Sequence, residues 1–302
     1  MADEKRQIRQ LKALVVRRLL LPILIIAAAL LYEPVKKWWG IGSGTVPVTD
    51  GSKLQVSYID VGQGDATLIC KGDFRMLIDA GDNHAGETVV EYLKNKQIDS
   101  LDMVVGTHLD SDHIGGLDTV VEQIPADVVY MPQEDKDTKT YKEVLTALQK
   151  RKLSASLPEI GKEYIFEDNV RLRFLSPQKK YSDSNNNSLV VQLAFGETRF
   201  LFMGDAEEKA EKDILARGYD LECDVLKLGH HGSYTATGKE FLKQANPTYG
   251  IISCGTDNAY GHPHAETLAK LEDEDVQVYR TDTMGTIEAV SDGSNVTLST
   301  RG

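Results

Sequence analysis

Residues 107–116 read THLDSDHIGG and place four side chains that can bind a metal ion in one short loop: His108, Asp110, Asp112 and His113. Two carboxylates crowded into one turn repel each other unless a cation lies between them. Because alternate residues of such a loop can point into one site, we expect His108 and Asp110 to face one metal ion. Asp112 and His113 are then expected to turn toward a second.

Further acidic and histidine side chains follow other apolar runs, as functional groups at strand ends do. Asp205 follows FLFMG, and the pair His230-His231 follows VLKLG. With one histidine of that pair the set reaches six ligands, enough for two metal ions bridged by Asp205. The sequence leaves open which of the two histidines is used. Paired metal ions lie roughly 3.5–4 Å apart and bind the attacking and the leaving oxygen of an in-line displacement.

Short apolar runs of strand type alternate with segments of helical periodicity from residue 54 onward. We expect strands at 54–60, 66–70, 74–79, 103–106, 128–131, 170–175, 189–195, 199–203, 225–228, 250–253, 276–280, 286–290 and 296–299. We expect helices at 87–97, 117–123, 141–152, 206–217, 239–245 and 265–274. Hairpins come first and strand–helix units follow. The predicted fold class is therefore α/β, with sheets covered by helices in one domain of about 250 residues.

The composition is that of a globular protein with a sizeable core, since 41% of the 302 residues are hydrophobic and 26% are charged. The three cysteines form no C-x-x-C pair, and we expect Cys70 and Cys254 to be buried free thiols. The net charge of −12 is uneven, because residues 1–40 hold eight Lys/Arg against three acids (+5) and leave −17 on the other 262 residues. A globular part with this much negative charge is not typical of proteins that bind nucleic acid, because phosphates attract Lys and Arg.

Residues 19–32, LLLPILIIAAALLY, form an uncharged and mainly apolar stretch. Fourteen helical residues span roughly 21 Å, but extension back to Ala13 gives 20 residues if Arg17 and Arg18 reach the headgroups. No clean A-x-A site follows for a cleaved signal peptide, and a buried helix would not be preceded by six basic residues. We therefore expect one membrane anchor within residues 1–39 and a linker at 40–52. The catalytic domain is expected at 53–302, outside the cytoplasmic membrane.

The ligand loops resemble the metallo-β-lactamase-fold hydrolases, whose signature is H-x-H-x-D-H followed by a distant Asp and His. A narrower resemblance is to the β-lactamase-like domain of the ComEC family, the bacterial competence DNA-uptake proteins. It rests on ordered segments that cover roughly residues 54–290: YIDVGQGDA (58–66), LIDAGD (77–82), THLDSDHIGGL (107–117), NNNSLVVQLAFGETRFLFMGDAE (185–207), VLKLGHHGS (225–233), PTYGIISCG (247–255), NAYGHPH (258–264) and YRTDTMGTI (279–287).

This resemblance implies an αββα sandwich of two sheets with a two-metal site at one edge. The ligands it implies are His108, Asp110, Asp112, His113, Asp205 and His230, with His231 as the alternative to His230. Asp79 is expected behind the ligands, where it would orient their loop. Four more residues are expected to approach the metals or the substrate: Gln63, Asp65, Asn187 and Ser188.

Asp110 supplies a carboxylate where the common signature has an imidazole, so the site is harder and we expect two divalent ions, either Zn²⁺ or Mn²⁺. The expected catalytic residues are Asp112 and His262. The resemblance gives His262 a role at the substrate, either protonating a leaving alkoxide or binding a phosphate oxygen. Asp282 is expected to hold His262 in one tautomer.

The pattern favours phosphoester hydrolysis, most of all by a ComEC-like nuclease or phosphodiesterase acting on a substrate such as DNA. ComEC proteins also have a multi-helix membrane channel and an OB-like region, which these 302 residues do not contain, so DNA transport is not implied. The alternative is a phosphorylcholine-esterase-like hydrolase of cell-wall polymers, because related extracellular esterases share H-x-D-x-D-H and H-H-G-S, and an acidic surface suits a cationic head. A non-catalytic DNA- or wall-binding module and a carbon-ester or lactone hydrolase also remain open, as does the oligomeric state.

Overall fold

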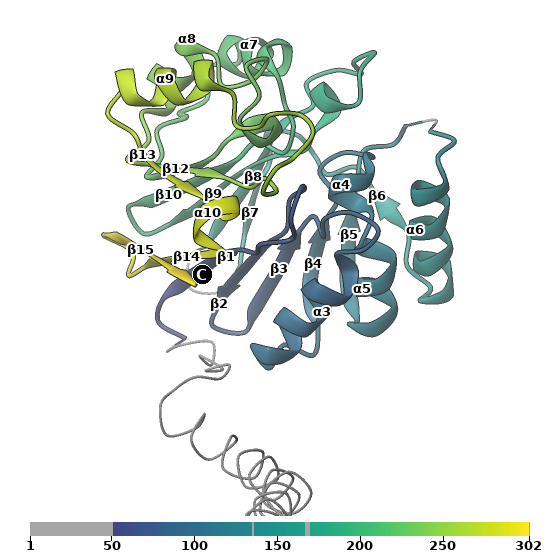
Figure 1. Cartoon of the computed structure of the whole chain (residues 1–302). Coiled ribbons are helices and arrows are strands. Elements are labelled where there is room, and N and C mark those ends of the chain that lie inside the picture. Colours follow the sequence, from purple (N-terminus) through teal and green to yellow (C-terminus); the bar gives the residue numbers. More distant parts are fainter. Residues whose placement is uncertain (1–50, 135, 167–169, 302) are drawn as a thin grey trace, which may run out of the picture. The chain divides into compact units, whose positions relative to one another are not determined.

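The computed structural model describes residues 51–134, 136–166 and 170–301 (Figure 1). The chain divides into two units, residues 1–46 and 47–302, and the second contains every described residue. The predicted membrane anchor and most of the predicted linker lie outside the described residues. Within the described residues, no helix combines the length and the apolar character that crossing a membrane requires.

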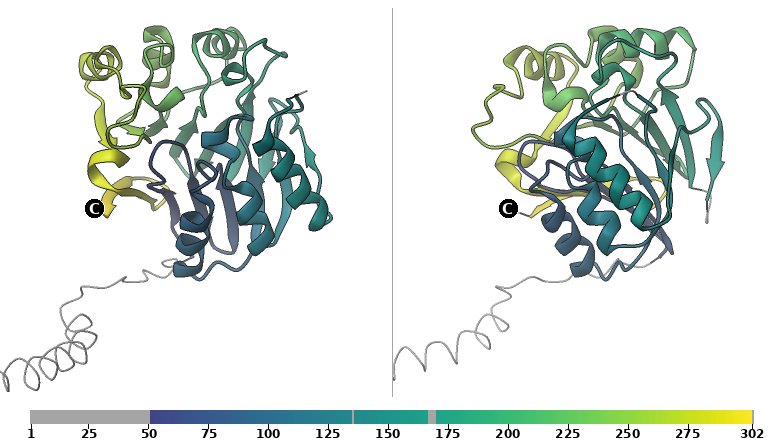
Figure 2. Two further views of the ribbon diagram at one scale, coloured as in Figure 1. Left: turned by 45° about the vertical axis from the view of Figure 1, so that its right-hand side comes forward. Right: turned by 90° about the vertical axis from the view of Figure 1, so that its right-hand side faces the viewer.

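Two β-sheets lie face to face in the described part of the chain (Figures 1 and 2). The eight-stranded sheet has the order β15 (Val296–Arg301), β14 (Thr286–Ser291), β1 (Leu54–Tyr58), β2 (Thr67–Lys71), β3 (Phe74–Ile78), β4 (Leu101–Val105), β5 (Ala126–Tyr130), β6 (Ala155–Ser156). The seven-stranded sheet has the order β13 (Gln277–Arg280), β12 (Tyr249–Ile252), β11 (Val225–Lys227), β10 (Thr198–Phe202), β9 (Val190–Phe195), β8 (Arg171–Ser176), β7 (Glu163–Ile165).

Helices cover the outer face of each sheet, as the two views of Figure 2 show. The eight-stranded sheet carries α3 (Gly86–Asn95), α5 (Leu117–Gln123) and α6 (Lys139–Lys150). The seven-stranded sheet carries α7 (Glu208–Ala216), α8 (Lys239–Ala245) and α9 (Ala265–Asp273). In the described segments, four single-turn helices lie in loops: α4 (Ser111–Ile114), α10 (Thr281–Met284), η3 (Asn185–Asn187) and η4 (Gly229–Gly232). The α/β sandwich of two sheets and flanking helices is therefore confirmed.

The layers hold together because the central strands are apolar on both faces. In β2, Ile69 faces the core between the sheets, whereas its neighbours Leu68 and Cys70 face the core beneath the helices. Successive side chains of a strand point to opposite faces, so one run of apolar residues serves two cores. The cysteines Cys70, Cys223 and Cys254 are buried and free, as expected for Cys70 and Cys254.

The strand directions bring the expected ligand loops to one edge of each sheet. Strands β3 and β4 are parallel, and so are β10, β11 and β12. The loops after β3 and β4 carry Asp79 and His108, and the loops after β10 and β11 carry Asp205 and His231. Loops at the carboxyl ends of parallel strands are where sheets of this kind present functional groups.

Candidate metal centre

The ligand loop after β4 packs closely against the loop after β3, and two glycines make this possible. A Cβ at Gly116 would overlap the carbonyl oxygen of Ala80, and one at Gly115 would overlap the carbonyl oxygen of Ser111. The backbone of this loop is tied down as well, because Ala80 N donates to the carbonyl oxygen of His113 at 2.8 Å. The Gly-Gly pair that ends THLDSDHIGG is therefore required by close packing as well as by the turn.

One group of ligand atoms gathers around Asp205 Oδ1. His113 Nε2 lies 3.1 Å from Asp205 Oδ1, and His231 Nε2 lies 3.6 Å from the same oxygen. The two imidazole nitrogens are 3.3 Å apart, and Asp112 Oδ2 is 3.3 Å from His231 Nε2. These four side chains come from three loops and can supply four ligands to one cation.

A second group gathers around the other oxygen of the same carboxylate. His108 Nε2 lies 3.8 Å from Asp205 Oδ2 and 3.8 Å from Asp110 Oδ2. His230 Nε2 lies 3.9 Å from Asp205 Oδ2. The two oxygens of Asp205 thus face two separate groups of donors, which is the arrangement expected of a carboxylate that bridges two cations.

The chemistry of these donors fits a metal site. Among the described residues, His108 Nε2 is a buried atom without a hydrogen-bond partner, and the buried Asp205 Oδ1 is faced by two imidazole nitrogens. Buried polar atoms are normally satisfied, so donors that converge without partners are explained by a cation between them. Ligand atoms of Asp65, His113, Asp205 and His231 all lie within 4.8 Å of one another. His108, Asp110, Asp112, His113 and Asp205 are brought together as the sequence predicted.

Carboxylates and imidazoles of the cluster shift each other's pKa values, so that each favours the charged form of the other. Burial disfavours ionisation of Asp205, but the imidazoles of His113 and His231 outweigh it and hold the pKa of this carboxyl well below its ordinary value. Burial likewise disfavours a charged His231, yet Asp205, Asp112 and Asp65 raise its pKa to about 10. Protons on the imidazoles thus compensate the carboxylates in the metal-free protein, and a divalent cation can replace them.

Asp79 holds the ligand loop from behind. Its Oδ1 accepts a hydrogen bond from Thr107 N at 2.7 Å, and its Oδ2 accepts from Thr107 Oγ1 at 2.7 Å and from His113 Nδ1 at 2.8 Å. A proton held on Nδ1 of His113 leaves Nε2 free to bind a metal, which is how outer carboxylates orient metal-binding histidines.

The two adjacent histidines differ in their surroundings. Both adopt the left-handed region, with φ of 49° at His230 and 53° at His231, and their ring planes are 67° apart. His231 is buried and belongs to the compact cluster, whereas His230 is partly exposed. His230 Nδ1 lies 3.1 Å from Glu207 Oε1, so its Nε2 is turned toward Asp205. The geometry thus places both histidines at the centre, with His231 deeper.

Three supporting residues were not predicted from the sequence. Lys227 is buried, and its Nζ lies 2.8 Å from Asp65 Oδ2, while Asp65 Oδ1 lies 3.3 Å from His231 Nδ1. Lys136 pairs with Asp110, and Glu207 orients His230. A lysine inside the apolar run VLKLG was the one available signal for Lys227, because charged residues are rarely buried without a partner. The other two stand in ordinary loops.

Three expectations about polar residues near the centre, those for Asn187, Ser188 and Asp282, are corrected by their hydrogen bonds. The Asn187 side chain binds the backbone of Tyr181, and Ser188 Oγ accepts from Asp205 N at 3.1 Å, so neither is turned to a metal. Gln63 Oε1 accepts from Gly255 N at 3.1 Å and joins two loops. Asp282 forms two hydrogen bonds to Arg280, and within the described residues His262 Nδ1 has no hydrogen-bond partner. Asp282 therefore does not fix the tautomer of His262.

His262 lies beside the cluster on the loop after β12. Its ring centroid is 5.3 Å from that of His230 and 6.0 Å from that of His231. Asn258 fixes this part of the loop, because its Oδ1 accepts from His262 N at 2.9 Å and its Nδ2 donates to the carbonyl oxygen of His262 at 2.6 Å. Burial and the neighbouring imidazoles lower the pKa of His262 to about 4, which leaves a neutral ring at neutral pH.

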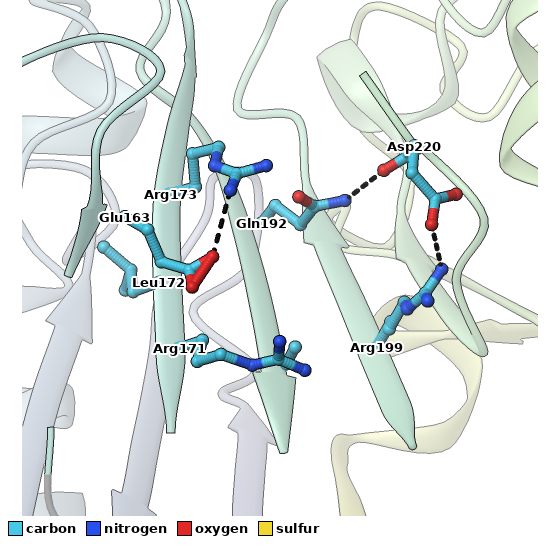
Figure 3. Close-up of a pocket in the computed structure, with 8 residues that line it drawn as sticks. Glu163, Arg171, Leu172, Arg173, Gln192, Arg199 and Asp220 are labelled. Atoms are coloured by element: carbon cyan, nitrogen blue, oxygen red, sulfur yellow. Dashed lines mark hydrogen bonds and ion pairs between the residues drawn. The ribbon is translucent and has the colours of Figure 1, made fainter. Parts of the chain in front are cut away.

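A separate polar pocket of about 160 Å³ lies on the seven-stranded sheet and contains none of the predicted site residues (Figure 3). Its lining includes three arginines on β8 and β10, Arg171, Arg173 and Arg199. Arg173 pairs with Glu163 at 2.9 Å and Arg199 with Asp220 at 2.7 Å, as the dashed lines of Figure 3 show. These acids offset most of the positive charge, so the pocket offers a phosphate little net attraction.

The fold and this centre define the class of the protein. Residues 59–256 match the family model of the metallo-beta-lactamase superfamily, and the chain belongs to that superfamily. It is a metal-dependent hydrolase of this superfamily, with an Asp/His cluster able to bind metal. Two solved structures share the fold. Igni18, a metallo hydrolase from Ignicoccus hospitalis, has 17% identity and a TM-score of 0.54, covering 78% of this chain and 98% of that one. YhfI from Bacillus subtilis has 12% identity and a TM-score of 0.52, covering 82% of this chain and 99% of that one.

Curated relatives place the chain more narrowly. It is 33% identical over 260 residues to ComE operon protein 3 of Bacillus subtilis, covering 78% of this chain and 33% of that protein. It is 32% identical over 223 residues to Recombination protein 2 of Haemophilus influenzae, covering 72% of this chain and 26% of that protein. Competence protein ComA of Neisseria gonorrhoeae is 29% identical over 240 residues, covering 78% of this chain and 32% of that protein. The chain thus spans a third or less of these relatives, and its resemblance to the ComEC β-lactamase-like domain is confirmed.

Proposed function

We propose that this protein hydrolyses phosphodiester bonds and that its substrate is nucleic acid. The observation that carries the proposal is the Asp205 carboxylate, whose two oxygens face two separate groups of donors. Two divalent cations, Zn²⁺ or Mn²⁺, would be held by one histidine–carboxylate group on each side of Asp205. Cations bound there would supply a water of lowered pKa and Lewis-acid stabilisation of the phosphoryl oxygens.

The chain's own residues position these groups. Asp79 and the carbonyl oxygen of Ser253 hold protons on the Nδ1 atoms of His113 and His231, so that both Nε2 atoms face the cluster. His262 lies beside the cluster with an Nδ1 that no described residue engages, and a neutral imidazole can donate one N–H to a phosphate oxygen. The relatives named for competence and recombination support nucleic acid as the substrate.

The acidic charge of the globular part favours a second candidate. The whole chain has a net charge of −12 and residues 1–40 carry +5, which leaves −17 on the other 262 residues. A globular part with this charge would repel a polynucleotide and attract a cationic head. A phosphorylcholine ester is therefore the alternative substrate. We further propose that residues 1–39 anchor the protein in the cytoplasmic membrane by one helix, with the catalytic domain on the outer side. The basic residues that precede the apolar stretch support this orientation.

A side-by-side assay tests the proposal. Single-stranded DNA, double-stranded DNA, RNA and a phosphorylcholine ester are each incubated with the protein in Mn²⁺ and in Zn²⁺. We expect cleavage of a nucleic acid, and a loss of at least about 10³-fold in kcat for Asp112→Ala, because one ligand of the cluster is removed. Asp99→Ala, at an exposed position before β4 and so at the end of that strand opposite to the ligand loop, is the matched control and should retain full activity.

Two outcomes would overturn the proposal. Equal rates for wild type and Asp112→Ala on every phosphodiester would show that the cluster does not act in catalysis. Turnover of the phosphorylcholine ester alone would leave the metal centre in place but transfer the function to the second candidate.

A further inference from the structure

Four aromatic rings form a continuous series that runs from the surface at Tyr260, past the metal centre at His262, and back to the surface at Tyr234. We call Tyr260, His262, His264 and Tyr234 the aromatic wall. The Tyr260 and His262 ring centroids are 5.6 Å apart, with ring planes only 19° from parallel. His262 meets His264 edge-on at 4.9 Å, and His264 meets Tyr234 edge-on at 5.0 Å. These separations lie in the range at which aromatic rings attract each other.

The two end rings of the wall are exposed, and the ring beside the metal centre is buried. His262 is 8% exposed, whereas Tyr260 is 66% exposed and Tyr234 is 60% exposed. Single exposed apolar side chains are normal on any protein surface. Here, however, the exposed rings rest on two imidazoles, one of which is 5.3 Å from the ring of His230. The open face of Tyr260 therefore lies one imidazole away from the metal centre.

The wall is held in place by contacts among three loops. Tyr234 N donates to His264 Nδ1 at 3.2 Å, and His264 N donates to the carbonyl oxygen of Gly232 at 3.0 Å. A Cβ at Gly232 would lie 2.7 Å from Pro263 Cβ, so the two loops touch. Gln63 attaches the third loop through Gly255 N. The loops that carry the rings are fixed in this way, and the Tyr260 ring rests on the buried His262 ring. Loops that are already ordered lose little conformational freedom when a ligand binds.

We propose that the aromatic wall is a base-stacking subsite: a nucleobase stacks on the open face of Tyr260 while its phosphate reaches His262 and the metal centre. The inference rests on the proposed function and narrows its substrate to nucleic acid with unpaired bases. The Tyr260 ring lies nearly parallel to the His262 imidazole, so a planar base placed on the other face of Tyr260 would extend this stack. A quaternary ammonium is instead recognised by aromatic faces that surround it. Stacking needs an unpaired base, so single strands are preferred over duplexes.

The test compares a single-stranded oligonucleotide with the same oligonucleotide carrying abasic sites. For Tyr260→Ala we expect KM for the intact strand to rise roughly tenfold with a small change in kcat, because a stacked base contributes to binding. Tyr260→Phe keeps the ring and should behave as wild type. The abasic strand should bind wild type and Tyr260→Ala equally weakly. Ile165→Ala is the matched control, since Ile165 is 68% exposed on β7.

A binding measurement separates this inference from the proposed function. The full chain with Asp112→Ala is titrated with a fluorescent single strand, with and without the additional Tyr260→Ala change. A tenfold loss of affinity in the double variant supports the wall even if no cleavage is ever seen. An unchanged affinity, or an equal loss for intact and abasic strands, overturns the wall while leaving phosphodiester hydrolysis untouched. Tighter binding of phosphorylcholine than of the strand, dependent on Tyr260, also overturns it.

Discussion

His231 Nδ1 lies 2.9 Å from the carbonyl oxygen of Ser253, and a carbonyl oxygen can only accept a hydrogen bond. The proton therefore stays on Nδ1, and Nε2 is the nitrogen that faces the cluster. Ser253 follows β12, whereas His231 follows β11, so the backbone of one loop selects the tautomer of a ring on the neighbouring loop. The same logic applies to His113, whose Nδ1 bonds Asp79 at 2.8 Å.

The first prediction compares the two adjacent histidines. We expect His231→Ala to weaken metal affinity by at least about 100-fold, because it removes a buried ligand from the compact cluster. His230→Ala should cost roughly tenfold, since its Nε2 is 3.9 Å from Asp205 Oδ2 and its ring is partly exposed. Competition with a chromophoric chelator in Zn²⁺ or Mn²⁺ measures both, and His84→Ala, at an exposed residue, serves as the control. The opposite ranking would contradict this assignment.

The second prediction concerns Asp79. In Asp79→Asn an amide N–H faces the positions where Oδ2 now accepts from His113 Nδ1 and Thr107 Oγ1. The proton of His113 is then driven toward Nε2, so we expect metal affinity to fall roughly 10- to 100-fold with the fold intact. Chelator competition measures the metal affinity, and circular dichroism shows whether the fold is intact. Asp73→Asn, in the exposed turn between β2 and β3, should change neither the metal affinity nor the fold. An unaltered metal affinity in Asp79→Asn would contradict this role of Asp79.

The third prediction concerns the buried pair of Lys227 and Asp65. Lys227→Met leaves the Asp65 carboxylate buried without its ammonium partner at 2.8 Å. We expect the free energy of unfolding of the metal-free protein to fall by about 3 kcal/mol. Adding Asp65→Leu to Lys227→Met should restore part of it, because the Asp65 carboxylate is then no longer buried without its lysine, while Asp205 and Asp112 still compensate His231. Urea denaturation measures all three proteins, and Lys239→Met is the exposed control. Full stability of the single variant would refute this account.

The fourth prediction is a pH dependence at Glu211 in α7. Burial raises the pKa of Glu211 to about 7, although its carboxylate accepts from Thr237 N and Gly238 N. A folded-state pKa above the unfolded value means that the stability is complete below about pH 4.5 and is lost as the pH rises through 7. The unfolding free energy of wild type minus that of Glu211→Gln should therefore fall by roughly 3 kcal/mol from pH 4.5 to pH 8. A difference that stays constant over this range would contradict the shifted pKa.

The regular elements could largely be predicted from the sequence, because their apolar periodicity is local information. The helices expected at 117–123 and 239–245 match α5 and α8, and the thirteen expected strands all have counterparts within a few residues. The structure adds β6, β7, α4 and α10, which are two to four residues long. Elements this short contain no repeat of the apolar pattern, so only their partners in space define them.

The types of ligand and their order along the chain were also readable. Four metal-binding side chains in one loop, an aspartate after one strand and a histidine pair after another are each visible as residues at strand ends. The supporting residues were not, because Lys227, Glu207 and Lys136 act through partners that are distant in sequence. Asp282 shows the converse, since we expected it to hold His262 in one tautomer, whereas in the fold its carboxylate bonds Arg280.

From the residues of THLDSDHIGG alone it follows that this loop belongs to a metal centre, and the other donors can be read off the strand ends. How these donors are shared between two groups depends on the fold. The two oxygens of Asp205 divide the ligands into two groups, and the left-handed backbone at His230 and His231 points their rings differently. Ring direction and tautomer depend on backbone angles and on acceptors from other loops, which no local pattern in a sequence contains.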